Sequence, residues 1–424
     1  MRISTTTIYD TGIATMQQQT EKLMQVQQQI STGRRILTPA DDPVAAARIL
    51  EVNQSQSINQ QYISNSGAAS DSLSLEESTL GSITQLLQSV RDVAVNAGDA
   101  TLTQSDRASL ATQLRGSYQQ LLGLANSTDA GGQYLFSGYH GGTRPYSEAS
   151  PGNVVYGGDQ GQRLIQVGAS RQIAVSDSGS DVFQRIRTGN GTFATQAAAG
   201  NGGSAVIDPG TVLDAQTWKA AANSTGYTIK FGVSGGVTTY DIIDKDSGNS
   251  LLTGATAAAS PPYPRSYSSG SNIDLSQAGL PAFDLGLRVS IAGAPKDGDS
   301  FSVTASKNQD VFKTIDDLAN LLQTSAGGAQ LTNGLTVAQG NLDNALENIL
   351  TVRASVGARM KELDTAKSTG DDRALQYSDT LSRLQDVDYA KAASELTQQQ
   401  VNLQAAQKSF TMVSGLSLFN YLTP

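Results

Sequence analysis

The stretch QISTGRRILTPADDPV, residues 29–44, separates two segments that both have the residue spacing of a helix. Gly33 follows the first segment, at a position where a left-handed residue commonly ends a helix. Asp42 is a good N-cap, and Pro43 suits the first helical position because that residue needs no N–H. The stretch therefore predicts a joint between two helices, with these structural residues: Gly33, Pro39, Asp41, Asp42 and Pro43.

The adjacent aspartates of this joint have an alternative interpretation as an acid–base or cation-binding pair. Neighbouring residues do not share a helix face, and paired catalytic carboxylates normally come from separate segments that face a cleft. The pattern at Asp41 and Asp42 therefore favours the structural role.

Heptad spacing continues outward from the joint. Alternating steps of three and four residues place apolar side chains on one stripe, which is the seam of a coiled coil. Clear seams begin at Leu73, Leu342 and Tyr389. We therefore predict an α+β chain in which helices from both ends form a long antiparallel hairpin or coiled-coil bundle around a central insert.

Both chain ends are poor in charge. Residues 389–424 contain only Lys391, Glu395 and Lys408, and residues 1–30 contain only four charged side chains. A monomer rarely leaves a helix so uncharged unless most of its circumference contacts protein. We therefore predict that both ends pack into a polymer and are loosely ordered or disordered in the free chain. The alternative is a pair of poorly ordered tails without a partner.

The predicted assembly interface takes its residues from these two ends. Near the N-terminus the seam is weak, since its second position is filled by Ile13, Thr20 and Gln27. The residues expected to make assembly contacts are Met16, Leu23, Ile30, Leu396, Leu403, Phe410 and Val413, with Phe419 and Tyr421 anchoring the last turn.

The middle of the chain is rich in residues that break helices. Of the 42 glycines, 26 lie between Gly138 and Gly298, so this part should be β-rich. Alternating residues predict two hairpins, one from 226–233 with 237–243 and one from 287–293 with 299–305. Residues 297–299, Asp-Gly-Asp, lack the twelve-residue calcium pattern, so a hairpin turn is favoured there over a calcium loop.

Composition excludes several kinds of chemistry. The chain has no cysteine and one histidine, His140, which rules out zinc–thiolate sites, iron–sulfur clusters and poly-histidine metal sites. His140 lies in a glycine-rich turn and is expected to be a surface residue. A net charge of −9 without a basic stripe argues against nucleic acid and anionic membranes as partners. No catalytic residue, metal or cofactor is expected.

Several stretches are similar to the family of flagellar hook–filament junction proteins, which are relatives of the bacterial flagellins. They are MRISTTTIYD (1–10), QQQISTGRRILTPADDPVAAARIL (27–50), GQYLFSGY (132–139), GAPKDGDSFSV (293–303) and LSLFNYL (416–422). Flagellins have a related joint, S-G-x-R-I followed by D-D-A-A. The prolines on both sides of the aspartate pair, together with the C-terminal LFNYL, favour the junction family.

This resemblance implies three parts: terminal polymerisation helices at 1–40 and 389–424, a helical bundle at 41–140 and 311–388, and a variable β-rich insert at 141–310. It implies a structural adaptor of the flagellum between the first hook-associated protein and flagellin, assembled with copies of itself in a ring. It also implies export by the flagellar type III apparatus without a cleaved signal peptide, and an export chaperone on the C-terminal helix. Such an uncleaved signal would account for the absence of an apolar signal-peptide segment near the N-terminus.

Two other functions remain open from the sequence. The first is flagellin itself, the filament subunit. The second, more remote, is a secreted hydrolase in the insert, for which a pair of inward carboxylates at glycosidase spacing would be the sign.

Overall fold

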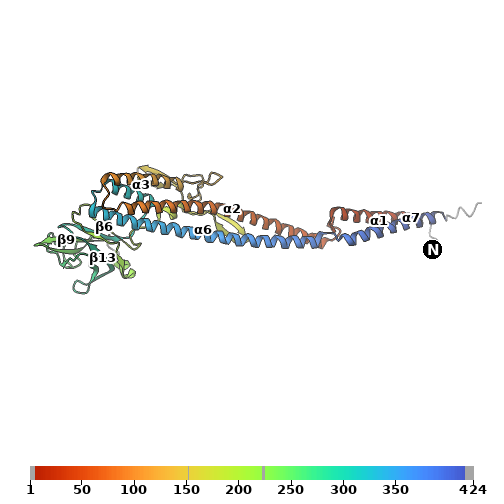
Figure 1. The fold of residues 1–424 in the computed structure, drawn as a ribbon. Helices are drawn as coiled ribbons and strands as arrows, with labels where there is room; N and C mark the ends of the chain where they lie inside the picture. The colour runs from red at the N-terminus through yellow and green to blue at the C-terminus, as the bar shows by residue number, and fades with distance from the viewer. Residues whose placement is uncertain (1–4, 151, 222–224, 416–424) are drawn as a thin grey trace, which may run out of the picture. The chain divides into compact units, whose positions relative to one another are not determined.

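The computed structural model describes residues 5–150, 152–221 and 225–415 (Figure 1). The chain divides into two compact units. The larger unit comprises residues 67–166 and 170–363, and the smaller one comprises 1–66, 167–169 and 364–424. The predicted fold class is confirmed, because the N- and C-terminal regions are helical and the central insert is β-rich.

In the larger unit, two long helices run antiparallel. They are α2 (Pro43–Asn96) and α6 (Gly328–Gln385), and both continue into the smaller unit. Ion pairs link them at Arg91–Asp343 and Glu77–Arg353, both at 2.6 Å. The heptad positions expected on α2 and at the residue after it, from Leu73 to Ala97, are all buried. Those on α6, from Leu342 to Leu363, are buried or half-buried, so these two stripes form the seam.

Two shorter helices, α3 (Gln104–Ala125) and α5 (Val311–Thr324), pack against each other. Thr103 begins α3 with a reciprocal capping box to Asp106, and the carboxylate of Asp310 caps α5. Aromatic rings from both helices meet those of the turns and strands that follow α3 in one cluster: Tyr118, Phe136, Tyr146, Tyr156, Phe183 and Phe312.

Short elements connect this helical part to the insert. Two small hairpins are formed by β1 (Tyr146–Ser150) with β2 (Asn153–Tyr156), and by β3 (Leu164–Gly168) with β4 (Arg171–Ala174). A π-helical turn, η1 (Ser180–Gln184), then leads into β5 (Ile186–Arg187), which pairs with β15 (Asn308–Gln309). The chain enters and leaves the insert through this pair.

The insert is a two-sheet sandwich. One sheet has the order β11-β10-β9-β14-β6, and its strands are β6 (Phe193–Ala197), β9 (Tyr227–Ser234), β10 (Val237–Asp244), β11 (Arg265–Ser266) and β14 (Ser300–Ala305). The other has the order β12-β13-β7, with β8 also on β13; its strands are β7 (Val206–Ile207), β8 (Thr211–Val212), β12 (Asn272–Gln277) and β13 (Phe283–Ala292). The core includes Phe231, Phe301, Leu287 and Ile291, together with Trp218 of α4 (Ala215–Ala221).

The first predicted hairpin is present and the second is wrong. Strands β9 and β10 pair through Gly235 and Gly236, whose φ angles of +59° and +80° suit a tight hairpin turn. Strands β13 and β14 do not pair: β13 joins β12, β7 and β8, whereas β14 joins β6 and β9. Each strand has one apolar face, and the two faces meet across the sandwich instead of lying in one sheet.

Residues 294–298 therefore cross from one sheet to the other. The carboxylate of Asp299 is 3% exposed and accepts backbone N–H groups of Gly202 at 2.8 Å, Gly203 at 3.0 Å and Lys296 at 2.8 Å. These bonds occupy the carboxylate of Asp299, which belongs to the Asp-Gly-Asp stretch considered above as a calcium loop.

The smaller unit contains α1 (Thr5–Thr32), α7 (Tyr389–Gly415) and the ends of α2 and α6. At those ends the side chain of Asn59 donates to the carbonyl oxygen of Gly370 at 2.7 Å. A Cβ at Gly370 would lie 2.7 Å from Ile63, so glycine allows this close approach. Within the described parts of the chain, we find no helix with the length and apolarity needed to cross a membrane.

Candidate functional site

Helices α1 and α7 form an antiparallel pair in the smaller unit. Phe410 lies against Gly12, and the hydroxyl of Tyr389 lies against Gly33, so the two helices run in opposite directions. On α7 every covered side chain is at an expected heptad position, but the first expected position, Tyr389, is exposed. These covered residues are Ala392, Leu396, Gln399, Leu403, Ala406 and Phe410.

The facing stripe of α1 differs in part from the prediction. Met16, Leu23 and Ile30 do lie in the seam, but Ile13 and Gln27 are exposed and Thr20 lies at its flank. Steps of three and four from Met16 lead instead to Gly12, Gln19 and Val26, which are covered. Periodicity of apolar residues missed these positions because a glycine and a glutamine occupy two of them.

Gly12 provides the space for the ring of Phe410. A Cβ at Gly12 would lie 2.6 Å from this ring, closer than any ordinary contact. The ring of Tyr9 packs edge-on against the same ring, with 5.6 Å between centroids. This end of the pair is therefore an aromatic contact that only glycine at position 12 admits.

Replacing Gly12 with alanine is expected to loosen the pair, although alanine favours a helix by about 1 kcal/mol. The new methyl group displaces Phe410, and amide hydrogen exchange should speed up in both α1 and α7. Gly67→Ala on α2 is the matched control, because nothing lies within 4 Å of a Cβ there. That control should leave exchange in α1 and α7 unchanged. Slower exchange in Gly12→Ala would contradict the assigned contact.

The α1–α7 pair fully buries few side chains and leaves buried polar atoms without hydrogen bonds. The Oε1 atoms of Gln19 and Gln399 are buried without a hydrogen-bond partner, and each such atom typically costs about 1–3 kcal/mol. The outward face also carries apolar side chains, with Ile13 exposed to 44%, Met24 and Val401 to 58% and Met412 to 61%. A groove lined by one face of α1 runs between Ile13 and Met24.

The structure brings together six of the predicted assembly residues, half-buried between α1 and α7: Met16, Leu23, Ile30, Leu396, Leu403 and Phe410. The side chain of Val413, and Phe419 and Tyr421 altogether, lie outside the described residues. The assembly role of these residues stays a prediction.

The joint after α1 is hydrogen-bonded to a second joint between α6 and α7. Gly33 follows the last residue of α1 and has a φ of +70°. Its carbonyl oxygen accepts the N–H of Val387 at 2.9 Å, and the N–H of Arg35 donates to Gln385 at 2.6 Å. The Arg35 guanidinium also donates to the carbonyl of Leu384 at 2.7 Å. Both chain segments therefore turn together, which the sequence patterns did not reveal.

The two aspartates of the joint bind its own backbone. Asp41 accepts the N–H of Thr38 at 2.7 Å and of Leu37 at 3.0 Å, and these bonds, the one from Thr38 foremost, hold its pKa below the usual value. Asp42 accepts the N–H of Ala45 at 3.0 Å just before α2, whose first residue is Pro43. Pro39 lies in the turn between the helices. Backbone groups thus bind one oxygen of each carboxylate; Gln25 donates to the other oxygen of Asp41 at 2.9 Å, and Arg35 lies 3.7 Å from that of Asp42.

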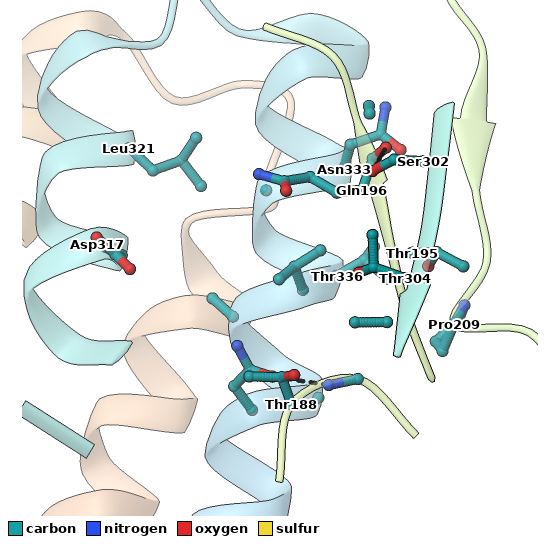
Figure 2. A pocket seen from close by; sticks show the side chains of 18 of the residues that line it. Thr188, Thr195, Gln196, Pro209, Ser302, Thr304, Asp317, Leu321, Asn333 and Thr336 are labelled. Carbon is teal, nitrogen blue, oxygen red and sulfur yellow. Dashed lines mark hydrogen bonds between the residues drawn. The ribbon is translucent and has the colours of Figure 1, made fainter. Parts of the chain in front are cut away.

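The larger unit contains a cleft of about 900 Å³ between the insert and the helices α5 and α6 (Figure 2). Its two carboxylates serve α5 itself: Asp310 accepts the N–H of Lys313 at 2.5 Å, and Asp317 pairs with the Lys313 ammonium at 2.6 Å. Burial raises the pKa of Asp310. His140 is largely exposed and lies 3.2 Å from Asp159. Among the residues described, no group of potential ligands could hold a metal ion.

Comparison with known proteins matches both helical ends. The N-terminal helical region of bacterial flagellin matches residues 3–141, and its C-terminal helical region matches residues 340–422. The chain belongs to the bacterial flagellin family. Within this family, flagellar hook-associated protein 3 of Escherichia coli is 30% identical over 419 residues, covering 99% of both chains.

A solved structure agrees with this placement in the flagellin family. The flagellar junction protein FlgL from Legionella pneumophila is 31% identical, has a TM-score of 0.67, and covers 81% of this chain and 100% of its own. Polar flagellin F of Vibrio parahaemolyticus is more distant, with 24% identity over 90% of this chain. The resemblance to hook-associated protein 3 is thus confirmed, and its relatives are structural proteins of the flagellum.

Proposed function

We propose that this chain is a structural protein of the bacterial flagellum that acts as an adaptor at the hook–filament junction. The observation that carries the proposal is the α1–α7 pair, which is short of charge and exposes apolar side chains outside its seam. Ile13, Met24, Val401 and Met412 point away from the seam, and such a surface suits assembly with further protein. Similarity to hook-associated protein 3 over 99% of both chains supports this position in the flagellum.

The proposed partners follow from that position. The chain would form a ring with copies of itself, with the first hook-associated protein below and flagellin above. The contacts are heterologous, in which one face of a subunit meets a different face of the next. We further propose export through the flagellar type III apparatus without a cleaved signal, with a chaperone covering the apolar seam of α7 in the cytoplasm.

Deleting the gene tests the junction role. Cells without this protein are expected to keep their hooks and to release unpolymerised flagellin into the medium, because flagellin would lack its attachment ring. Electron microscopy counts hooks and filaments, and immunoblotting measures flagellin in the medium. Expression from a plasmid should restore filaments. Filaments of normal length and number on the deletion strain would contradict the proposal.

Flagellin is the alternative function, supported by the more distant similarity to filament subunits. The two functions differ in whether the chain can extend itself. Purified protein that grows long filaments on its own seeds would favour flagellin, whereas a junction protein should stop after a short segment.

A further inference from the structure

Four asparagines on one face of α6 bind the insert and the π-helical turn that leads into it. Steps of eight, three and four residues separate them, and these steps keep side chains on one side of an α-helix. Each side-chain amide hydrogen-bonds to the backbone of residues 181–207. We call this set the asparagine ladder: Asn333, Asn341, Asn344 and Asn348.

Asn333 takes the place of a neighbouring strand. It is 5% exposed, its Nδ2 donates to the carbonyl of Ala205 at 3.0 Å, and its Oδ1 accepts the N–H of Ile207 at 3.0 Å. These groups lie at the edge of β7, whose other edge pairs with β13. One side-chain amide thus satisfies a backbone edge that would otherwise lack partners.

The other members bind where the insert leaves the helical part. Asn341 Oδ1 accepts the N–H of Gly189 at 3.1 Å, and Asn344 Nδ2 donates to the carbonyls of Arg187 and Gly189 at 2.7 and 2.8 Å. Asn348 donates to two carbonyls of the π-helical turn. The β5–β15 ladder beside them has only two residue pairs, so the neck of the insert is narrow.

Between the neck and β7 lies the cleft of Figure 2, which separates the sheet from α5 and α6. Gln196, Ser302 and Thr304 line it from the sheet, and Thr336 faces them from α6. The buried polar atoms without partners found among the described residues all lie elsewhere. Water can therefore solvate the cleft, and its lining calls for no ligand.

An attachment of this kind opens at low cost. Separating apolar faces loses hydrophobic free energy in proportion to area, but here the cleft already keeps the side chains of the sheet, which are mostly polar residues and alanines, apart from the helices. Each amide bond contributes only about 1 kcal/mol net, because water replaces it on opening. We propose that the insert turns as a rigid body on the β5–β15 neck, opening and closing the cleft, and that the ladder fixes the closed position: Asn333 latches the edge of β7, while Asn341 and Asn344 brace the neck.

Spin labels test the proposed motion, since the chain has no cysteine of its own. Spin labels are attached at Gln196→Cys and Thr336→Cys. The distance between them, measured by pulsed electron paramagnetic resonance, reports the width of the cleft. The unlatched variant carries Asn333→Ala, Asn341→Ala and Asn344→Ala in the full-length labelled chain. Its distance distribution is expected to broaden toward longer values than that of the labelled parent.

Hydrogen exchange gives a second readout. The amides of Gly189 and Ile207 should exchange roughly tenfold faster or more in the unlatched variant, as expected from losing their acceptors, while the amides of β9 and β10 keep their protection. Thr351→Ala is the control, because its hydroxyl bonds only to Glu347 of the same helix. An unchanged distance distribution would overturn the proposal. Loss of protection in β9 and β10 would also overturn it, since the ladder would then belong to the folding of the insert.

Discussion

Replacing Leu403 with aspartate is expected to abolish filament attachment while leaving the insert folded. Leu403 lies half-buried in the middle of the α7 seam, facing α1. A carboxylate there loses apolar burial and must be hydrated within the seam, which costs roughly 2 kcal/mol or more. The pair already carries two buried amide oxygens without partners, so it has little stability to lose.

Two measurements separate an assembly defect from misfolding. Electron microscopy of cells that carry only the variant should show hooks without filaments, and flagellin should accumulate in the medium. Circular dichroism of the purified variant should retain the strand signal and the thermal transition of the insert. Gln404→Asp is the matched control, since residue 404 is the next one along α7 and is exposed. Attached filaments of normal number on Leu403→Asp cells would refute the role of the seam.

The sequence predicted the helical seams well because their pattern is local. The α7 heptad and the α2 and α6 stripes follow directly from the spacing of apolar residues, and the structure covers the positions it describes except Tyr389, which is exposed. The hairpin at Gly235 and Gly236 is likewise local, since a two-residue glycine turn sets the pairing.

The features that the sequence did not reveal depend on partners far along the chain. Gly12 is in the seam because Phe410 needs the space, and nothing near Gly12 indicates this. Strand β14 leaves β13 because its apolar face completes the opposite sheet. Asn333 matters through Ile207, 126 residues away. The spacing of apolar residues does not identify a glycine that leaves space for a distant side chain. It also does not identify an amide side chain that hydrogen-bonds to a distant backbone segment.

Glu76 is a seam position of the same kind, and its replacement by glutamine is the second large effect we expect. The side chain is 1% exposed on α2, and its Oε1 accepts the backbone N–H of Asp177 at 3.0 Å. Asp177 in turn pairs with Arg359 of α6 and accepts the Gln162 amide at 2.8 Å. The half-buried Arg359 guanidinium therefore bonds to Asp177, whereas Oε2 of Glu76 is buried without a hydrogen-bond partner.

Burial, followed by the negative charge of Asp177, raises the pKa of Glu76 from 4.5 to about 8. The folded chain thus binds a proton on Glu76 between about pH 4.5 and 8, where the unfolded chain has released it. Under this linkage the free energy of unfolding falls as the pH rises through that window. The contribution of Glu76 is complete below the window and lost above it, at about 1.4 kcal/mol for each unit of pKa shift.

Glutamine has the shape of the protonated acid but cannot ionise, so Glu76→Gln should flatten this pH dependence and make the larger unit more stable than the parent above pH 8. Urea denaturation followed by the helical circular dichroism signal, from pH 5 to 9, measures the difference. Glu77→Gln is the matched control: Glu77 is the next residue, pairs with Arg353 at the seam's edge, and its side chain is 32% exposed. This control should show the same change of unfolding free energy with pH as the parent. Its free energy of unfolding should be lower than that of the parent by at most about 1 kcal/mol. An equal slope in Glu76→Gln and the parent would show that Glu76 is ionised in the folded chain, and that the single arginine neutralises both carboxylates.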